Sequence, residues 1–124
     1  MKKAIATTAA PGAIGPYSQA IDAGAFVFAS GQLPIDPATG IMPEGIEAQT
    51  AMSLANVKAI LAEAGLTTDN VVKTTVFLAD MAEFAAMNVV YSKNFSEPFP
   101  ARSAVAVKDL PKGARVEIEV IAAR

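Results

Sequence analysis

Apolar residues recur at helical spacing over residues 46–64, a stretch without glycine or proline. The repeating positions are three or four residues apart: Leu54, Val57, Leu61 and Ala64. This spacing places their side chains on one face of an α-helix. Gly65 follows, and glycine readily adopts the left-handed conformation that ends many helices. The pattern therefore predicts a helix over residues 46–64.

A capping signal predicts a second helix further along the chain. Asp80 is followed three residues later by Glu83, as in a capping box, so we expect this helix to begin near Met81. Its inner stripe is expected to contain four residues at helical spacing: Phe84, Asn88, Tyr91 and Phe95.

Alternating and β-branched stretches predict six strands. They cover residues 3–8, 17–22, 25–30, 70–79, 103–108 and 115–122. A tight turn at Ala23-Gly24 is expected to join the second strand to the third. Because residues 70–79 are apolar on both faces near their end, we expect a central strand covered on both sides. The apolar run after Arg102 likewise predicts a buried strand.

The short turn over residues 109–113 is expected to pair strands 103–108 and 115–122 as a hairpin. The resulting order is βββ-α-β-α-ββ, in which two helices can cover only one sheet face. We therefore predict an α+β fold, a single mixed sheet with two helices on one face, forming one domain over residues 1–124. The other face would stay bare, which favours an oligomer.

Composition strengthens the case for subunit contacts and narrows the possible chemistry. Apolar residues make up 52% of the 124 residues, and mean hydropathy is +0.37, a surplus that indicates surface buried against another subunit. The net charge is −2 and the basic residues are scattered, which argues against nucleic-acid binding. Without cysteine or histidine, the chain can form no disulfide, thiolate nucleophile, histidine general base or zinc site of the usual kind.

No export signal or membrane span is predicted. The N-terminal stretch has two lysines, but Thr7, Thr8, Pro11 and Gly12 interrupt any apolar run of signal-peptide length. No stretch approaches the roughly 18 apolar residues that a bilayer span requires. The absence of cysteine fits a reducing compartment, so we expect a cytoplasmic protein.

Arg102 stands at the start of an apolar strand, where the local pattern gives it no structural role. It is either a surface arginine or an anion-binding group whose planar fork of donors matches a carboxylate. Glu117 is either a solvated strand residue or a carboxylate that positions water and moves a proton. The alternation leaves open whether Glu117 or Glu119 faces a site near Arg102.

Four further residues have two interpretations each. Tyr17 is a core aromatic or flanks a pocket. Ser30 and Gly31 end a strand, where glycine serves a turn or lets the backbone approach a ligand. Asn88 interrupts an apolar stripe, so its amide is either a satisfied structural group or a polar group directed into a pocket.

Several stretches together resemble the Rid family, also called YjgF, in its RidA subgroup. They are "AIGPYSQAI", "FASGQLPIDPATG", "NVKAILAEAGLTTDNVVKTTVFLAD", "FAAMNVVY", "FPARSAVAV" and "LPKGARVEIEVIA", nearly end to end. The resemblance implies a chorismate-mutase-like subunit in a homotrimer with a central barrel and sites between subunits. Ala104 stands where many relatives have cysteine, and residues 92–101 are shorter than in some relatives.

The same resemblance implies the roles of the candidate residues. Arg102 would bind the substrate carboxylate, and Glu117 would activate a water. The remaining ligand contacts would come from Tyr17, Ser30, Gly31 and Asn88. The implied reaction is hydrolysis of 2-imino acids of the 2-aminoacrylate type to 2-oxo acids and ammonia, without cofactor or metal. The alternatives are a non-catalytic 2-oxo acid sensor or regulator, a ribonuclease or translation inhibitor, and a holdase chaperone.

Overall fold

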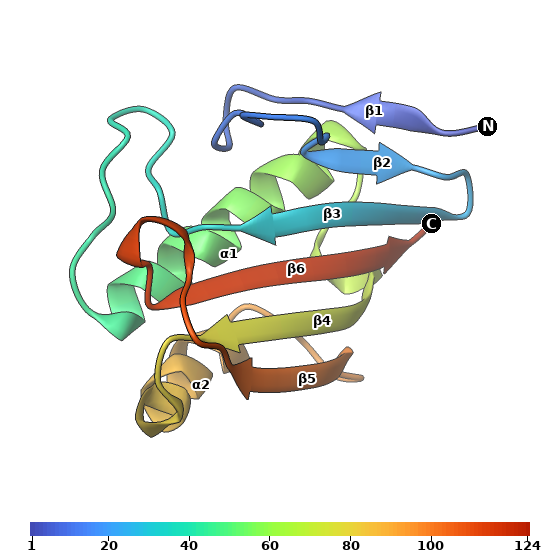
Figure 1. Ribbon diagram of the computed structural model, residues 1–124. Helices are drawn as coiled ribbons and strands as arrows, with labels where there is room; N and C mark the ends of the chain where they lie inside the picture. The colour runs from blue at the N-terminus through green and yellow to red at the C-terminus, as the bar shows by residue number, and fades with distance from the viewer.

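The computed structural model describes residues 1–124 and contains six strands, two α-helices and three short 3₁₀ turns (Figure 1). The strands are β1 (Lys3–Ile5), β2 (Ala20–Asp22), β3 (Phe26–Gln32), β4 (Val71–Leu78), β5 (Ala101–Ala106) and β6 (Val116–Ala123). The helices are α1 (Ile46–Glu63) and α2 (Phe84–Ser92). All six predicted strands and both helices are present, although β1 and β2 are shorter than predicted.

The shortening of β1 and β2 has a clear cause. Residues 6–19 form a loop around the buried amide of Gln19, which donates to the carbonyls of Thr7, Ala10 and Pro11 and accepts from the Thr7 backbone. These bonds satisfy backbone groups that a strand would have paired.

The sheet has the order β1-β2-β3-β6-β4-β5, and the predicted hairpin between 103–108 and 115–122 is wrong. β6 lies between β3 and β4, antiparallel to both, while β5 pairs with β4 in parallel. β6 carries Val116, Ile118 and Val120, all almost fully buried. β6, which is more apolar than β5, thus lies at the centre of the sheet, where burial stabilises apolar side chains most.

The first helix follows its prediction closely. α1 ends within one residue of the expected position, and Gly65 has a φ of 75°. The Leu66 amide donates to the Leu61 carbonyl and the Gly65 amide to the Ala62 carbonyl, the bond pair of a Schellman motif. α1 packs its apolar face on the sheet, behind β3 and β6 in Figure 1.

The start of the second helix differs from prediction. The Asp80 carboxylate accepts from the Ala82 amide, but it caps a 3₁₀ turn over Met81–Glu83, and α2 begins only at Phe84. The predicted capping box is wrong because the Glu83 carboxylate instead pairs with Arg115, 2.6 Å away. Arg115, from the C-terminal part of the chain, thus binds the carboxylate that was expected to cap the second helix.

The predicted burial of β5 and of both faces of β4 is not found within one chain. β5 is an edge strand with exposed and half-buried residues, because only β4 flanks it. β4 alternates between buried and more exposed positions, and Val72 on its outer face is 45% exposed. Within one chain, β4 is covered only on the side that faces the helices.

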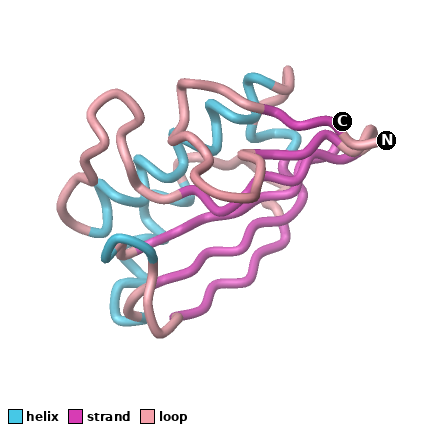
Figure 2. The backbone as a smooth tube through the Cα atoms, turned by 45° about the horizontal axis from the view of Figure 1, so that its top comes forward, coloured by secondary structure: helices cyan, strands magenta, loops and turns pink.

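Both helices lie on one sheet face, as predicted, and the hydrophobic core fills the space between the helices and the sheet. The other face is bare and partly apolar, with Phe26, Phe28 and Val105 each about 45% exposed. Figure 2 shows the strands side by side in one twisted sheet, with both termini at the same end. No helix is both long enough and apolar enough to cross a membrane.

Candidate active site

Arg102 projects from β5 toward the helices and is held by side chains of α2. Its guanidinium carbon lies 4.6 Å from the ring centroid of Tyr91 and 5.3 Å from that of Phe84. Its Nη1 donates to Oδ1 of Asn88 over 2.6 Å. These four residues form what we call the arginine cluster. A half-buried guanidinium held in this way is a preorganised anion-binding group.

Asn88 is neither an isolated buried amide nor a core residue. Its carbonyl oxygen accepts from Arg102, so its Nδ2 points elsewhere as a donor without a partner in the chain. The true inner stripe of α2 contains the buried Met87 and Tyr91, whereas Phe84 and Asn88 are half-buried beside Arg102. Met87 is the inner residue that the spacing did not single out.

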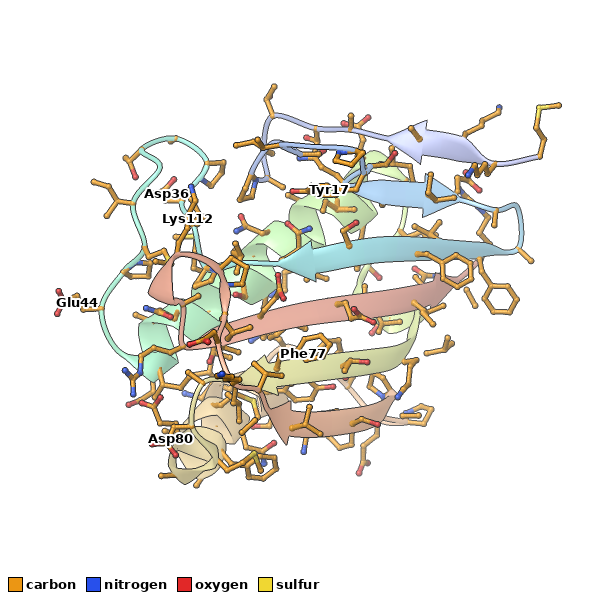
Figure 3. All side chains as sticks on the ribbon, viewed as in Figure 1. Tyr17, Asp36, Glu44, Phe77, Asp80 and Lys112 are labelled. Atoms are coloured by element: carbon orange, nitrogen blue, oxygen red, sulfur yellow. The ribbon has the colours of Figure 1, made fainter.

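A second group of predicted residues lines one cavity of about 830 Å³ on the other side of the molecule. It contains Tyr17, Ser30, Gly31 and Glu117, together with Glu119. We call it the glutamate cavity. Its lining includes Asp36 and Lys112, which come from two separate loops (Figure 3).

Glu117 lies directly over Gly31. An added Cβ on Gly31 would lie 2.8 Å from the Glu117 carboxyl carbon, so a side chain at this position would displace the glutamate from its place over β3. This close approach, rather than turn chemistry, explains the glycine. Gly31 sits at a register shift between β3 and β6, which brings the two backbones into this arrangement.

Burial, followed by repulsion from Glu119, raises the pKa of Glu117 above its usual range. Neither ion pair of the chain includes Glu117. Both glutamates line the cavity, but Glu117 is half-buried and Glu119 exposed, so the structure favours Glu117 for the inner position. A half-buried carboxylate without a cationic partner holds protons more readily than an ordinary glutamate.

Tyr17 and Ser30 complete the polar lining. Tyr17 is 54% exposed, so the interpretation as a core aromatic is wrong. Its ring flanks the cavity (Figure 3). The Ser30 hydroxyl donates to the Ser18 carbonyl over 2.6 Å, which leaves its oxygen lone pairs as acceptors. The Ser30 amide is used too, because it donates to the Gln19 carbonyl.

The arginine cluster and the glutamate cavity do not meet within one chain. Arg102 pairs in register with Thr74, whose side chain is buried on the helix side. Glu117 belongs to the opposite face, since its neighbours Val116 and Ile118 point to the helices. β4 also separates the two strands. The expectation that a hairpin would bring Glu117 or Glu119 near Arg102 in the same chain is therefore wrong.

Comparison with known proteins places the chain in a family. The family model described as Endoribonuclease L-PSP matches residues 7–124. The chain belongs to the Rid (YjgF) family. A protein of Salmonella typhimurium named 2-iminobutanoate/2-iminopropanoate deaminase is 52% identical, and the match covers 100% of this chain and 99% of that protein.

Solved structures of Rid-family relatives superimpose over almost the whole chain. E. coli TdcF, solved with bound serine, gives a TM-score of 0.94 at 46% identity, covering 98% of each chain. The YjgF gene product of E. coli gives a TM-score of 0.94 at 49% identity, also covering 98% of each chain. This agreement confirms the resemblance and the α+β fold of this Rid-family chain.

The sequence reasoning missed residues of both groups. Phe84 and Tyr91 were expected to be helix-stripe residues, and nothing in their spacing indicated that they lie under Arg102. Lys112 lines the glutamate cavity from a left-handed conformation with a φ of 58°. Its place before Gly113 in the turn over 109–113 was the available signal, since tight turns often need such conformations.

Proposed function

We propose that this protein hydrolyses reactive 2-imino and enamine acids of the 2-aminoacrylate type to 2-oxo acids and ammonia. The observation that carries the proposal is the pair of complementary groups: a preorganised, half-buried arginine and a half-buried carboxylate with a raised pKa. The names of full-length relatives support it, because proteins about 50% identical to this chain are named 2-iminobutanoate/2-iminopropanoate deaminase.

The substrate carboxylate binds to Arg102. Asn88 accepts from a single N–H of the guanidinium, so the others remain to form charge-assisted hydrogen bonds with the substrate. Such bonds contribute roughly 1.5–3 kcal/mol each. The Asn88 Nδ2 adds a further donor. Serine in the relative E. coli TdcF supports this ligand class, because serine also combines a small carboxylate with an α-nitrogen.

Glu117 activates the water. Its carboxylate takes a proton from water as the water oxygen bonds to the imine carbon, and the C=N electron pair moves to nitrogen. The protonated Glu117 then returns the proton to the amine nitrogen. Glu117 next takes the proton of the carbinol hydroxyl and delivers it to the amine nitrogen as the C=O bond forms and the C–N bond breaks, so ammonia and the 2-oxo acid are released. A raised pKa suits a group that both takes and returns a proton near neutral pH.

We further propose that the complete site forms between subunits of a homotrimer, with Arg102 from one subunit facing the glutamate cavity of the next. Two observations support this. Arg102 and Glu117 lie on opposite sheet faces of one chain, and the bare face exposes the apolar residues Phe26, Phe28 and Val105. Association through the bare faces would form the central barrel and cover β4 on both sides. Tyr17, Ser30 and Gly31 would then line the cleft.

A coupled assay tests the activity. A pyridoxal-phosphate dehydratase acting on serine generates 2-aminoacrylate, and the release of pyruvate is followed with and without the protein. We expect faster release, and Arg102→Ala should lower kcat/KM by about 10²- to 10⁴-fold through loss of two charge-assisted bonds. Arg115→Ala is the matched control, since Arg115 pairs with Glu83 outside both groups. Unaccelerated pyruvate release by the wild type would refute the proposal.

Mixing two inactive variants tests the inter-subunit site. Arg102→Ala and Glu117→Gln chains are unfolded and refolded together in equal amounts. If each site takes its arginine and glutamate from different subunits, about one quarter of the sites regain both groups. Continued inactivity of a mixed trimer would contradict the shared site, and a monomer mass in light scattering would contradict the trimer.

Two alternatives yield different outcomes. A non-catalytic 2-oxo acid sensor would bind pyruvate without accelerating its release. A ribonuclease would cleave RNA in an Arg102-dependent way, but the glutamate cavity contains Asp36, Glu117 and Glu119 against only Lys112, which repels a phosphate backbone. The proposed role places the protein beside the dehydratases whose products it removes, in the cytoplasm.

A further inference from the structure

Two aromatic rings of α2 lie under the Arg102 guanidinium and take no part in the proposed reaction. The guanidinium carbon is 4.6 Å from the Tyr91 centroid and 5.3 Å from the Phe84 centroid, both within cation–π range. Phe84 is half-buried and Tyr91 is only 5% exposed. We call these two rings the aromatic shelf.

Tyr91 is itself fixed from behind. Its hydroxyl shares a 2.8 Å hydrogen bond with the hydroxyl of Thr74, which is fully buried on β4. Its ring centroid lies 4.7 Å from that of Phe95. Thr74 is also the residue opposite Arg102 in the parallel β4–β5 pair. Thr74 is therefore connected to Arg102 in two ways. Its backbone lies opposite that of Arg102, and its hydroxyl bonds to Tyr91, whose ring contacts the guanidinium.

The contacts of Arg102 leave a defined set of donors. Both ring centroids of the shelf lie within 5.3 Å of the guanidinium carbon, and Asn88 accepts from Nη1 over 2.6 Å. A guanidinium has five N–H donors, so four remain, on Nε, Nη1 and Nη2. Without the shelf, a long side chain on an exposed edge strand would sample many rotamers, and binding would have to restrict them.

We infer that Phe84 and Tyr91 are positioning residues that hold Arg102 in its anion-binding orientation before the substrate arrives. The inference rests on the proposed function for its kinetic consequence, although the order of the Arg102 side chain can be measured without any activity. The residues do not touch the substrate. They act by reducing the conformational freedom that Arg102 would otherwise lose on binding.

The direct test is the NMR order parameter of the arginine Nε–H groups. The chain has only three arginines, at 102, 115 and 124. Arg115 serves as an internal reference, because its Nε donates to Glu83. In the wild type we expect similar order at Arg102 and Arg115. In Tyr91→Leu the Arg102 order parameter should fall below about 0.6, the flexible range, while Arg115 is unchanged.

Steady-state kinetics provide the second measurement. Tyr91→Leu should raise KM about 5- to 20-fold and change kcat less than about 3-fold, as expected for lost ground-state positioning. Phe84→Leu should raise KM about 2- to 5-fold, given its longer distance. Tyr91→Phe keeps the ring, so it should keep KM within about 3-fold and preserve the order of Arg102.

The outcomes separate this inference from the proposed function. If the wild type shows no deaminase activity, the proposed function fails, and the order parameters with the pyruvate affinity of the same variants still decide the role of the shelf. If Arg102 remains ordered with unchanged KM in both leucine variants, the inference is overturned while the deaminase stands. A fall in kcat at constant KM would also overturn it. If Tyr91→Leu does not fold, the order of Arg102 and the KM of Phe84→Leu decide whether the inference stands, because Phe84 is only half-buried at the start of α2.

Discussion

The arginine cluster and the glutamate cavity hold charges in opposite ways. Arg102 lies on an exposed edge strand, yet two rings and an amide oxygen contact it. Glu117 lies on a central strand, half-buried, in neither ion pair of the chain and close to the like charge of Glu119. The positive charge of Arg102 is stabilised by the two rings and the amide oxygen, whereas the negative charge of Glu117 is destabilised by burial and by Glu119.

This difference corresponds to two tasks. A group that binds a substrate carboxylate works best when it is ordered and permanently charged, which favours an arginine with preformed contacts. A group that exchanges protons works best when its pKa lies near the working pH, which favours a carboxylate deprived of partners. Under the proposed function, the arginine cluster binds the substrate in the ground state and the glutamate cavity transfers the proton.

The largest effect on this comparison is expected from Glu117→Gln. Loss of a positioned acid/base lowers kcat by about 10²- to 10⁴-fold, while KM stays close to wild type because Arg102 still binds the carboxylate. The coupled pyruvate assay measures both constants. Glu44→Gln is the control, since Glu44 lies on an exposed loop and points away from the molecule in Figure 3. A raised KM at wild-type kcat would reverse the assignment of tasks.

The same variant should be more stable at pH 7. Because the folded-state pKa of Glu117 is raised, its contribution to stability is present below the unfolded-state pKa and is lost as pH rises through the folded-state pKa. The ionised carboxylate therefore costs stability at neutral pH, and Glu117→Gln removes that cost. Thermal unfolding should show a higher Tm at pH 7 and a smaller difference toward pH 4. A lower Tm at pH 7 would indicate an unrecognised stabilising partner.

The next effect is expected from Gly31→Ala. The new methyl would lie 2.8 Å from the Glu117 carboxyl carbon, so the side chain must move from its position over β3. We expect kcat to fall about 10- to 100-fold, because small misplacements of a catalytic group are costly. In a Glu117→Gln background, Gly31→Ala should have little further effect, as residues acting as a unit are not additive. Fully additive losses would place Gly31 in a separate role.

A smaller effect on binding distinguishes two Asn88 variants. Asn88→Ala removes one contact of Arg102 and should raise KM only a few-fold, by roughly 1 kcal/mol for one hydrogen bond. Asn88→Asp keeps the shape but places a carboxylate against Nη1, 2.6 Å away in the wild type. It would compete with the substrate carboxylate, so KM should rise about 10-fold more than in Asn88→Ala. Equal KM values would argue against anion binding by Arg102.

The smallest effect is a shift in pH dependence. Glu117 must be ionised to accept a proton, so activity should fall on acidification at a higher pH than an ordinary glutamate would require. Glu119→Gln removes one cause of the raised pKa, so this acidic limb should move to lower pH. The pH profile of kcat/KM measures the shift. An unchanged limb would mean that burial alone raises the pKa of Glu117.

Sequence patterns were reliable where the interactions are local. The helix over 46–64 was predicted to within one residue because its period and Gly65 act within a few residues of each other. In β6, Val116, Ile118 and Val120 alternate with Glu117 and Glu119, and the structure buries the face that carries the three apolar residues. Predictions failed where a distant residue intervened. Glu83 pairs with Arg115 rather than capping a helix, and β6 pairs with β3 and β4 rather than with β5.

The sequence alone determined the chemical repertoire, the candidate residues and their family. The absence of histidine and cysteine left few residues other than Arg102 and Glu117 able to organise a reaction, and the motifs around them mark a Rid-family chain. Only the tertiary structure decided that these two residues lie on opposite sheet faces, that Gly31 lies against the Glu117 carboxylate, and that Tyr91 and Phe84 lie under Arg102. These contacts join residues far apart along the chain, and strand order and register set them, which no local pattern specifies.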